Sequence, residues 1–134
     1  MPKSLILIYI STFFSQVAVA NELALSVSFL NGAKFELVQK SAKAKYTIER
    51  IDKKGSVKSK EIPAGLAETI LSDSVKIVWT ASYSAKPKMK CTVAGHIEVR
   101  SKEDSASICR EHQKSYSMFM ELKKRLEGLL PDSN

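Results

Sequence analysis

The chain has 134 residues, of which 44% are hydrophobic and 26% charged, and its net charge is +7. These values are typical of a globular chain that buries one modest core, and they exclude a chain with two independent cores. The positive net charge favours anionic partners.

The first twenty residues have the three parts of a cleavable secretory signal peptide. Lys3 supplies the positive start, Leu5–Phe14 is mostly apolar, and Ala18–Ala20 ends in the small-x-small pattern that signal peptidase accepts. The apolar part is shorter than the ~20 residues that span a bilayer, so an uncleaved anchor is the less favoured alternative. We therefore expect residues 1–20 to be removed and residues 21–134 to form a single small exported domain, either periplasmic or extracellular.

The mature chain would keep a net charge of +6, since Lys3 is the only charged residue of the leader. No later stretch is long and apolar enough to cross a membrane, so we expect no transmembrane segment in the mature chain.

The first mature segments predict a β-hairpin. Ala24–Leu30 alternates apolar and polar residues, Asn31-Gly32 follows, and Ala33–Val38 alternates again. Asn-Gly is a favoured pair in tight hairpin turns because both residues tolerate positive φ. Lys45–Ile51 predicts a third strand by the same alternation.

A fourth strand is predicted over Ser56–Ile62, after a turn that ends in Gly55. Its apolar content is low and it contains lysines, which is typical of a strand at a sheet edge. Together with the turn before it, the segment holds four lysines: Lys53, Lys54, Lys58 and Lys60.

The segment after Pro63 is harder to assign. Leu66–Leu71 predicts a short helix, and residues 75–83 then alternate with β-branched and aromatic residues, which favours a strand. The alternative is a continued helix, with Leu71, Val75 and Val78 on one face.

The last third of the chain predicts a bulged strand or hairpin over Lys88–Arg100 and a C-terminal helix over Glu111–Leu130. Residues 105–109 are either one more strand or the start of that helix, because Ser101 to Asp104 also has the form of a helix start. The helix prediction depends on an apolar stripe at helical spacing, formed by Tyr116, Phe119, Leu122, Leu126 and Leu129.

These elements predict an α+β fold, a small antiparallel sheet packed against a C-terminal amphipathic helix. Only two cysteines occur, Cys91 and Cys109. In an oxidising compartment they are expected to form a disulfide, which closes a loop of roughly 19 residues and stabilises the fold by about 3 kcal/mol. Two buried free thiols are the alternative.

Lysines are the candidate binding residues. Lys86, Lys88 and Lys90 alternate, so on a strand they would form a row on one face; with Lys53, Lys54, Lys58 and Lys60 they make a weak anion-binding prediction. The candidate partners are an anionic glycan, a lipid surface or an acidic protein. Nucleic acid is not favoured, because basic and aromatic residues do not interleave. The competing interpretation is an ordinary solvated surface.

No motif indicates catalysis, a metal or a cofactor. No serine lies in Gly-x-Ser-x-Gly, and the spacing of His96 and His112 matches no known metal site. The sequence therefore predicts a non-enzymatic binding or accessory protein of the bacterial envelope or secreted space, whose oligomeric state it does not indicate. The alternative is a small hydrolase or metal-dependent enzyme that uses both histidines with Glu98 or Glu111.

Overall fold

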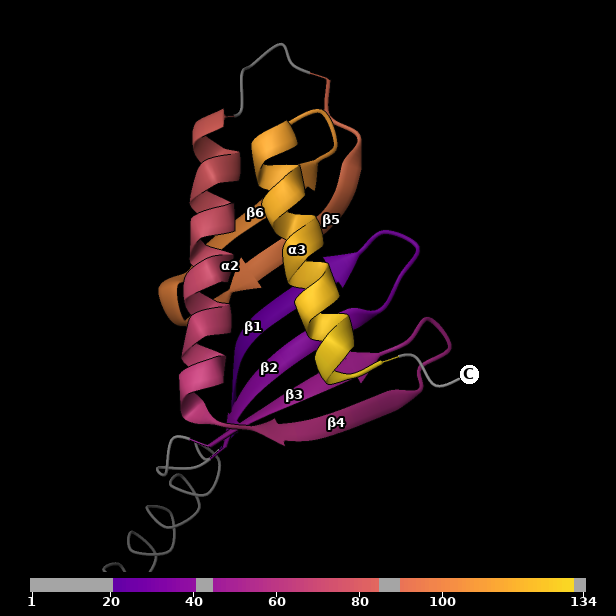
Figure 1. Cartoon of the computed structure of the whole chain (residues 1–134), viewed down its shortest axis with the longest axis vertical. Helices are drawn as coiled ribbons and strands as arrows, with labels where there is room; N and C mark the ends of the chain where they lie inside the picture. Colours follow the sequence, from indigo (N-terminus) through magenta and orange to yellow (C-terminus); the bar gives the residue numbers. More distant parts are fainter. Residues whose placement is uncertain (1–20, 41–44, 85–89, 132–134) are drawn as a thin grey trace, which may run out of the picture.

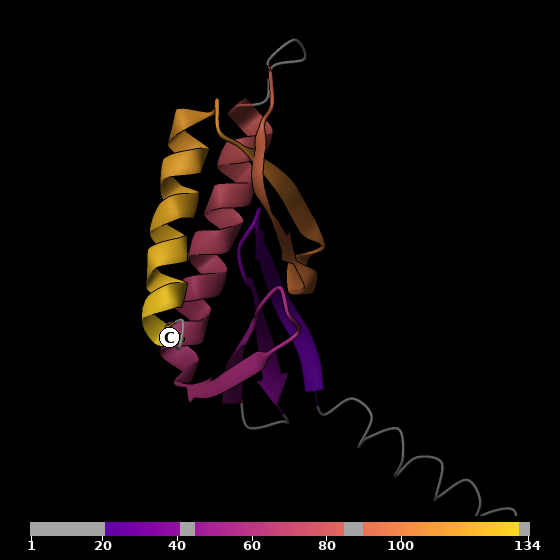
Figure 2. The same ribbon diagram turned by 90° about the vertical axis from the view of Figure 1, so that its right-hand side faces the viewer.

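The computed structural model describes residues 21–40, 45–84 and 90–131. Six antiparallel strands form one sheet in the order β4-β3-β2-β1-β5-β6, and two helices lie on one face of it (Figures 1 and 2). The predicted α+β class, the antiparallel sheet and the C-terminal helix are thereby confirmed. The elements in chain order are β1 (Asn21–Phe29), β2 (Lys34–Lys40), β3 (Lys45–Ile51), β4 (Val57–Ile62), α2 (Ala64–Ser84), β5 (Val93–Val99), the 3₁₀ turn η1 (Arg100–Lys102), β6 (Asp104–Cys109) and α3 (Gln113–Leu129).

The predicted first hairpin is confirmed. β1 pairs with β2 in a register that places Val27 opposite Phe35, and the Gly32 amide donates to the Phe29 carbonyl over 3.0 Å. The predicted two-residue Asn-Gly turn does not form: Asn31 takes positive φ (59°) but Gly32 does not, and residues 30–33 connect the two strands. β1 also pairs with β5, with Val27 opposite Ile97, so the first strand lies in the interior of the sheet.

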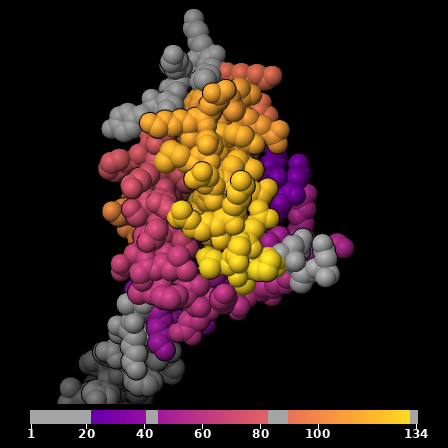
Figure 3. All heavy atoms as spheres, in the orientation of Figure 1, coloured from indigo at the N-terminus to yellow at the C-terminus, as the bar shows by residue number. Residues whose placement is uncertain are grey.

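The core lies between the sheet and the two helices. Alternate residues of β1 and β2 face the helices and are buried, which agrees with the alternation in the sequence: Leu25, Val27, Phe29, Phe35 and Leu37. Phe119 of α3 is fully buried, with its ring centroid 4.8 Å from that of Phe29. Figure 3 shows α3 and α2 side by side over this face. An ion pair between Arg125 and Asp73 joins the two helices.

The strand predicted over residues 75–83 is wrong, because one helix runs from Ala64 to Ser84. No glycine or proline follows Gly65 within this range, so nothing in the sequence ends the helix that begins after Pro63. The buried positions recur at helical spacing: Ala67, Ile70, Ser74, Ile77 and Ala81. Packing of this face against the sheet outweighs the β propensity of its valines and isoleucines.

The two possibilities for residues 105–109 are resolved in favour of a strand. β6 pairs with β5, with Ala106 opposite Ile97. Ser101 lies in η1 and Glu103 adopts a left-handed conformation (φ 53°) that turns the chain into β6. The C-terminal helix begins only at Gln113, with Phe119, Leu122 and Leu126 of the predicted stripe buried.

Among the helices of the described ranges, none has the length and apolarity needed to span a membrane.

Candidate functional site

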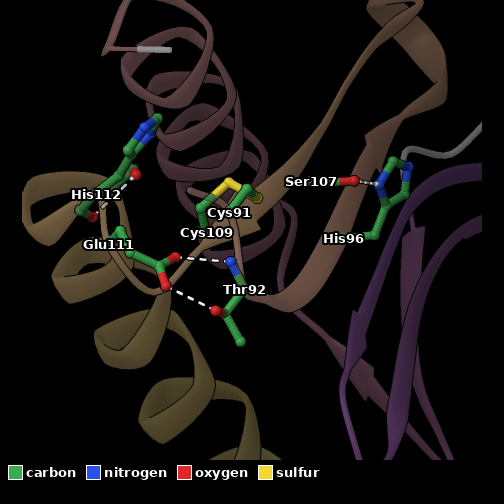
Figure 4. The surroundings of a disulfide bond; sticks show 8 residues. Cys91, Thr92, His96, Ser107, Cys109, Glu111 and His112 are labelled. Carbon is green, nitrogen blue, oxygen red and sulfur yellow. Dashed lines mark hydrogen bonds between the residues drawn. A yellow bond between two sulfur atoms is a disulfide. The ribbon is translucent and has the colours of Figure 1, made fainter. Parts of the chain in front are cut away.

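The two cysteines form the predicted disulfide. Cys91 lies just before β5 and Cys109 ends β6, with their Cα atoms 4.9 Å apart (Figure 4). The bond joins the two strands where β5 begins and β6 ends. Beside it, the Arg110 amide donates to the Thr92 carbonyl over 2.9 Å, which extends the pairing past the disulfide.

Glu111 makes a second link at the same place. Its carboxylate accepts hydrogen bonds from the Thr92 amide (2.7 Å) and from the Thr92 hydroxyl (2.6 Å), as Figure 4 shows. These bonds, helped by the charge of Lys90, lower the pKa of Glu111 to about 2. The carboxylate therefore serves as an acceptor that ties the segment before β5 to the segment before α3.

We expect the Glu111→Gln variant to show a flatter dependence of stability on pH. A carboxyl with a lowered pKa in the folded state stabilises the fold above the ordinary glutamate pKa, and this contribution is lost as the pH falls from about 4.5 to about 2. The amide of glutamine does not titrate. Melting temperatures measured across pH 2–7 check the prediction, with Glu121→Gln on an exposed position of α3 as the control. Identical slopes for wild type and Glu111→Gln would contradict it.

The structure does not bring the two histidines together. His96 lies on β5, on the sheet face that the helices leave open, and its Nδ1 is 3.2 Å from the Ser107 hydroxyl. His112 is buried before α3, where its carbonyl accepts a bond from the Tyr116 amide over 2.9 Å. They lie on opposite sides of the disulfide in Figure 4.

The acids named with the histidines also have other partners. Glu98 pairs with Arg100 at 3.1 Å, and Glu111 binds Thr92. Within the described ranges, no three histidine, cysteine or acidic side chains are placed to hold a metal ion. The residues proposed for the enzymatic alternative therefore do not share one site.

The four lysines of the β3–β4 hairpin lie at one edge of the sheet. Lys53 contacts the Asn31 side chain at 3.4 Å, and Lys58 donates to the Pro131 carbonyl over 3.0 Å. Lys54 lies in the turn and Lys60 on β4, and both are exposed. These four residues, Lys53, Lys54, Lys58 and Lys60, are called the hairpin lysines below.

Arg50 is a buried cation at the same end of the sheet that was not predicted from the sequence. It is 6% exposed on β3, and its guanidinium donates to the Leu130 carbonyl (2.9 Å) and to Asp52 (3.0 Å). With Lys58 it holds the carbonyls that follow α3, where a helix presents partial negative charge. The signal was present in the alternation of Tyr46, Ile48 and Arg50, which places the arginine on the inward face.

Of the predicted row of Lys86, Lys88 and Lys90, the structure describes Lys90. Lys86 and Lys88 lie outside the described residues. Lys90 is exposed and precedes β5, which begins at Val93, so the strand predicted to carry it does not extend that far. Lys90 instead contributes its charge to the environment of Glu111.

A hollow of about 370 Å³ lies between α2 and the η1 turn. Leu71, Val75 and Trp79 of α2 line one side, and Val99 and Lys102 line the other. Trp79 is 56% exposed, and its indole donates to the Asp104 carboxylate over 3.5 Å. This surface was not predicted, because the alternation of residues 75–83 favoured a strand, which would not place Trp79 one helical turn from Val75.

The fold and these contacts define a disulfide-bonded, two-layer α+β protein with a lysine-bearing sheet edge. No protein-family model matches the chain, and no curated protein is similar to it at a significant level.

Proposed function

We propose that this protein is a non-enzymatic binding or accessory protein of the bacterial envelope or secreted space, which contacts an anionic partner through the hairpin lysines. The observation that carries the proposal is the gathering of these four lysines on one hairpin, at the edge formed by β4. A partner with several negative charges can approach them together, and their compact ammonium groups bind phosphate or sulfate as point charges.

Charge placement supports this edge over the open face of the sheet. The open face carries charges of both signs that pair with one another, as Lys34 does with Glu36 and Lys45 with Glu61. Lys54 and Lys60, by contrast, are exposed at the edge. The proposed contact surface is therefore an edge and a turn, not a whole sheet face.

Export is the second part of the proposal. Its supports are the leader-like pattern of residues 1–20 and the disulfide between Cys91 and Cys109, since disulfides persist in oxidising compartments and are rare in the cytosol. In this view the protein acts in the periplasm or outside the cell.

The test of anion binding compares two double variants on immobilised sulfated polysaccharide and on anionic lipid vesicles. We expect the wild type to be retained at low salt and Lys54→Gln/Lys60→Gln to elute at a clearly lower salt concentration, because each lost contact lowers the number of released counter-ions. Lys114→Gln/Lys124→Gln on exposed positions of α3 is the matched control for net charge.

The two matrices separate the sources of the anion. Retention on the polysaccharide alone would indicate a glycan partner, and retention on the vesicles alone would indicate a lipid surface. No retention on either matrix at low salt would remove the anionic partner, and equal losses in both double variants would remove the hairpin lysines as its contact site.

A further inference from the structure

The two edges of the sheet differ in how they are protected. β4, at one edge, carries Lys58, Lys60 and Glu61 among its six residues, and such charges deter pairing with another strand. β6, at the other edge, has the sequence Asp-Ser-Ala-Ser-Ile-Cys and contains one charge, Asp104 at its beginning. Its outer side has no neighbour among the described strands. β6 is therefore the less protected of the two edges.

The backbone of β6 points its unused groups outward at alternate residues. The Arg110 amide bonds to Thr92 on the β5 side, so residues of the same parity face β5. The amides and carbonyls of Ser105 and Ser107 then face away from the sheet. Both side chains are small and exposed, so they leave room for a neighbouring strand.

An exposed apolar surface lies at the same edge. Trp79 contacts Asp104 at the start of β6. It also lines the hollow between α2 and η1, together with Leu71 and Val75. More than half of this large aromatic side chain is exposed. An exposed aromatic beside an open strand is typical of a surface that another protein covers.

We propose that this edge pairs with a second copy of the chain, β6 against β6 in antiparallel orientation, with Ser107 on the two-fold axis. This register places Ser107 opposite Ser107 and Ala106 opposite Ile108, a small residue against a large one. It also places Asp104 opposite Arg110 of the second copy, at both ends of the paired segment. Opposite charges directly across a strand pair stabilise it.

Charge also favours this register over the adjacent registers of the same strand pair. Each face of the sheet must continue across the axis, so only shifts that keep the alternation are allowed. The two nearest such shifts put Ala106 or Ile108 on the axis. The first brings Arg110 opposite Lys102, where like charges repel, and the second brings Arg110 opposite Ala106, so both lose the ion pairs with Asp104. In the proposed register the two sheets become continuous, and because α2 packs over β6 the two α2 helices and their Trp79 side chains approach each other.

The decisive experiment is a charge swap read by sedimentation velocity on the disulfide-bonded 21–134 chain, which contains the entire described core. We expect a concentration-dependent dimer. Arg110→Asp and Asp104→Arg should each weaken association by roughly tenfold or more, since each removes two ion pairs and creates two repulsions. The double variant Asp104→Arg/Arg110→Asp should restore the wild-type dissociation constant to within about threefold. In one copy the two positions are about 20 Å apart along β6, so rescue reports contact between copies.

Two further readouts separate pairing from misfolding. Trp79 is the only tryptophan, so its emission should shift to shorter wavelength as the dimer forms. Ser107→Pro removes an outward amide and leaves the backbone hydrogen bonds to β5 in place, although it also removes the hydroxyl that contacts His96. It should abolish that shift while circular dichroism still shows the fold, and Ser107→Ala, which lacks the same hydroxyl, should keep the dimer. Lys60→Glu at the opposite edge is the control and should leave the dimer intact.

A chain that stays monomeric at about 1 mM would overturn the proposal, because even a dissociation constant of that order would show there. A dimer that survives both Arg110→Asp and Ser107→Pro, or that the charge swap fails to restore, would also overturn it. The hairpin lysines lie at the other edge, so these outcomes are independent of anion binding.

Discussion

Replacing both cysteines by serine is expected to lower the free energy of unfolding by about 3 kcal/mol. The disulfide between Cys91 and Cys109 closes a loop with a sequence separation of 18, and removing it restores conformational entropy to the unfolded chain. Because small domains have only about 5–15 kcal/mol in total, the loss is a large share of the stability. Urea unfolding followed by far-ultraviolet circular dichroism measures it.

The native chain treated with a reductant is the control for this prediction. It should lose nearly the same free energy as Cys91→Ser/Cys109→Ser, because both chains lack the covalent link and differ only in a thiol or a hydroxyl at these two positions. Thr92 still donates to the Glu111 carboxylate and accepts from the Arg110 amide, which holds the same end of the β5–β6 pair, so we expect the fold to persist. A loss below about 1 kcal/mol would show that these bonds alone fix the loop.

The second large effect is expected at Gly95. A Cβ there would lie 2.3 Å from the Ser28 carbonyl oxygen and 2.5 Å from the Phe119 ring, both closer than any real contact. Because one neighbour is backbone of β1 and the other is a fully buried ring, neither can move without breaking the packing of the sheet on α3. Gly95→Ala should therefore lower the free energy of unfolding by about 3 kcal/mol or more.

Gly128→Ala is the matched control. A Cβ at Gly128 meets nothing within 4 Å, and the residue lies in α3, so alanine should stabilise the protein by up to about 1 kcal/mol through helix propensity. The two substitutions are chemically identical and should have opposite signs in the same thermal or urea unfolding assay. A destabilisation of less than 1 kcal/mol by Gly95→Ala would mean that β1 and α3 adapt to the added methyl group.

Local patterns predicted much of the architecture. The alternation from Leu25 to Leu37 and the Asn31-Gly32 pair were sufficient for the first hairpin, and the stripe through Phe119 was sufficient for the last helix. The disulfide between Cys91 and Cys109 could be predicted from the number of cysteines, because two cysteines allow one intramolecular disulfide. For the hairpin and the helix, the deciding residues lie close together in sequence.

Long-range packing accounts for what the sequence did not predict. Residues 75–83 alternate as a strand would, yet Ile77, Val78 and Ala81 are buried on a helix because the sheet they pack against is formed by distant segments. Arg50 binds the Leu130 carbonyl, 80 residues further along the chain. The contact of Trp79 with Asp104 likewise could not be predicted from local spacing, because the two residues are 25 positions apart.

The interior position of β1 makes completion of the fold depend on the whole chain. β1 finds its first partner, β2, immediately, but its second partner is β5, which ends at Val99. Any fragment that stops before Val93 would leave one side of β1 with unsatisfied backbone groups next to Leu25 and Val27. Pairing of β1 with the distant β5 is slow, because closing a long loop costs conformational entropy. A nascent or proteolytically shortened polypeptide would therefore expose an adhesive strand that the intact protein conceals.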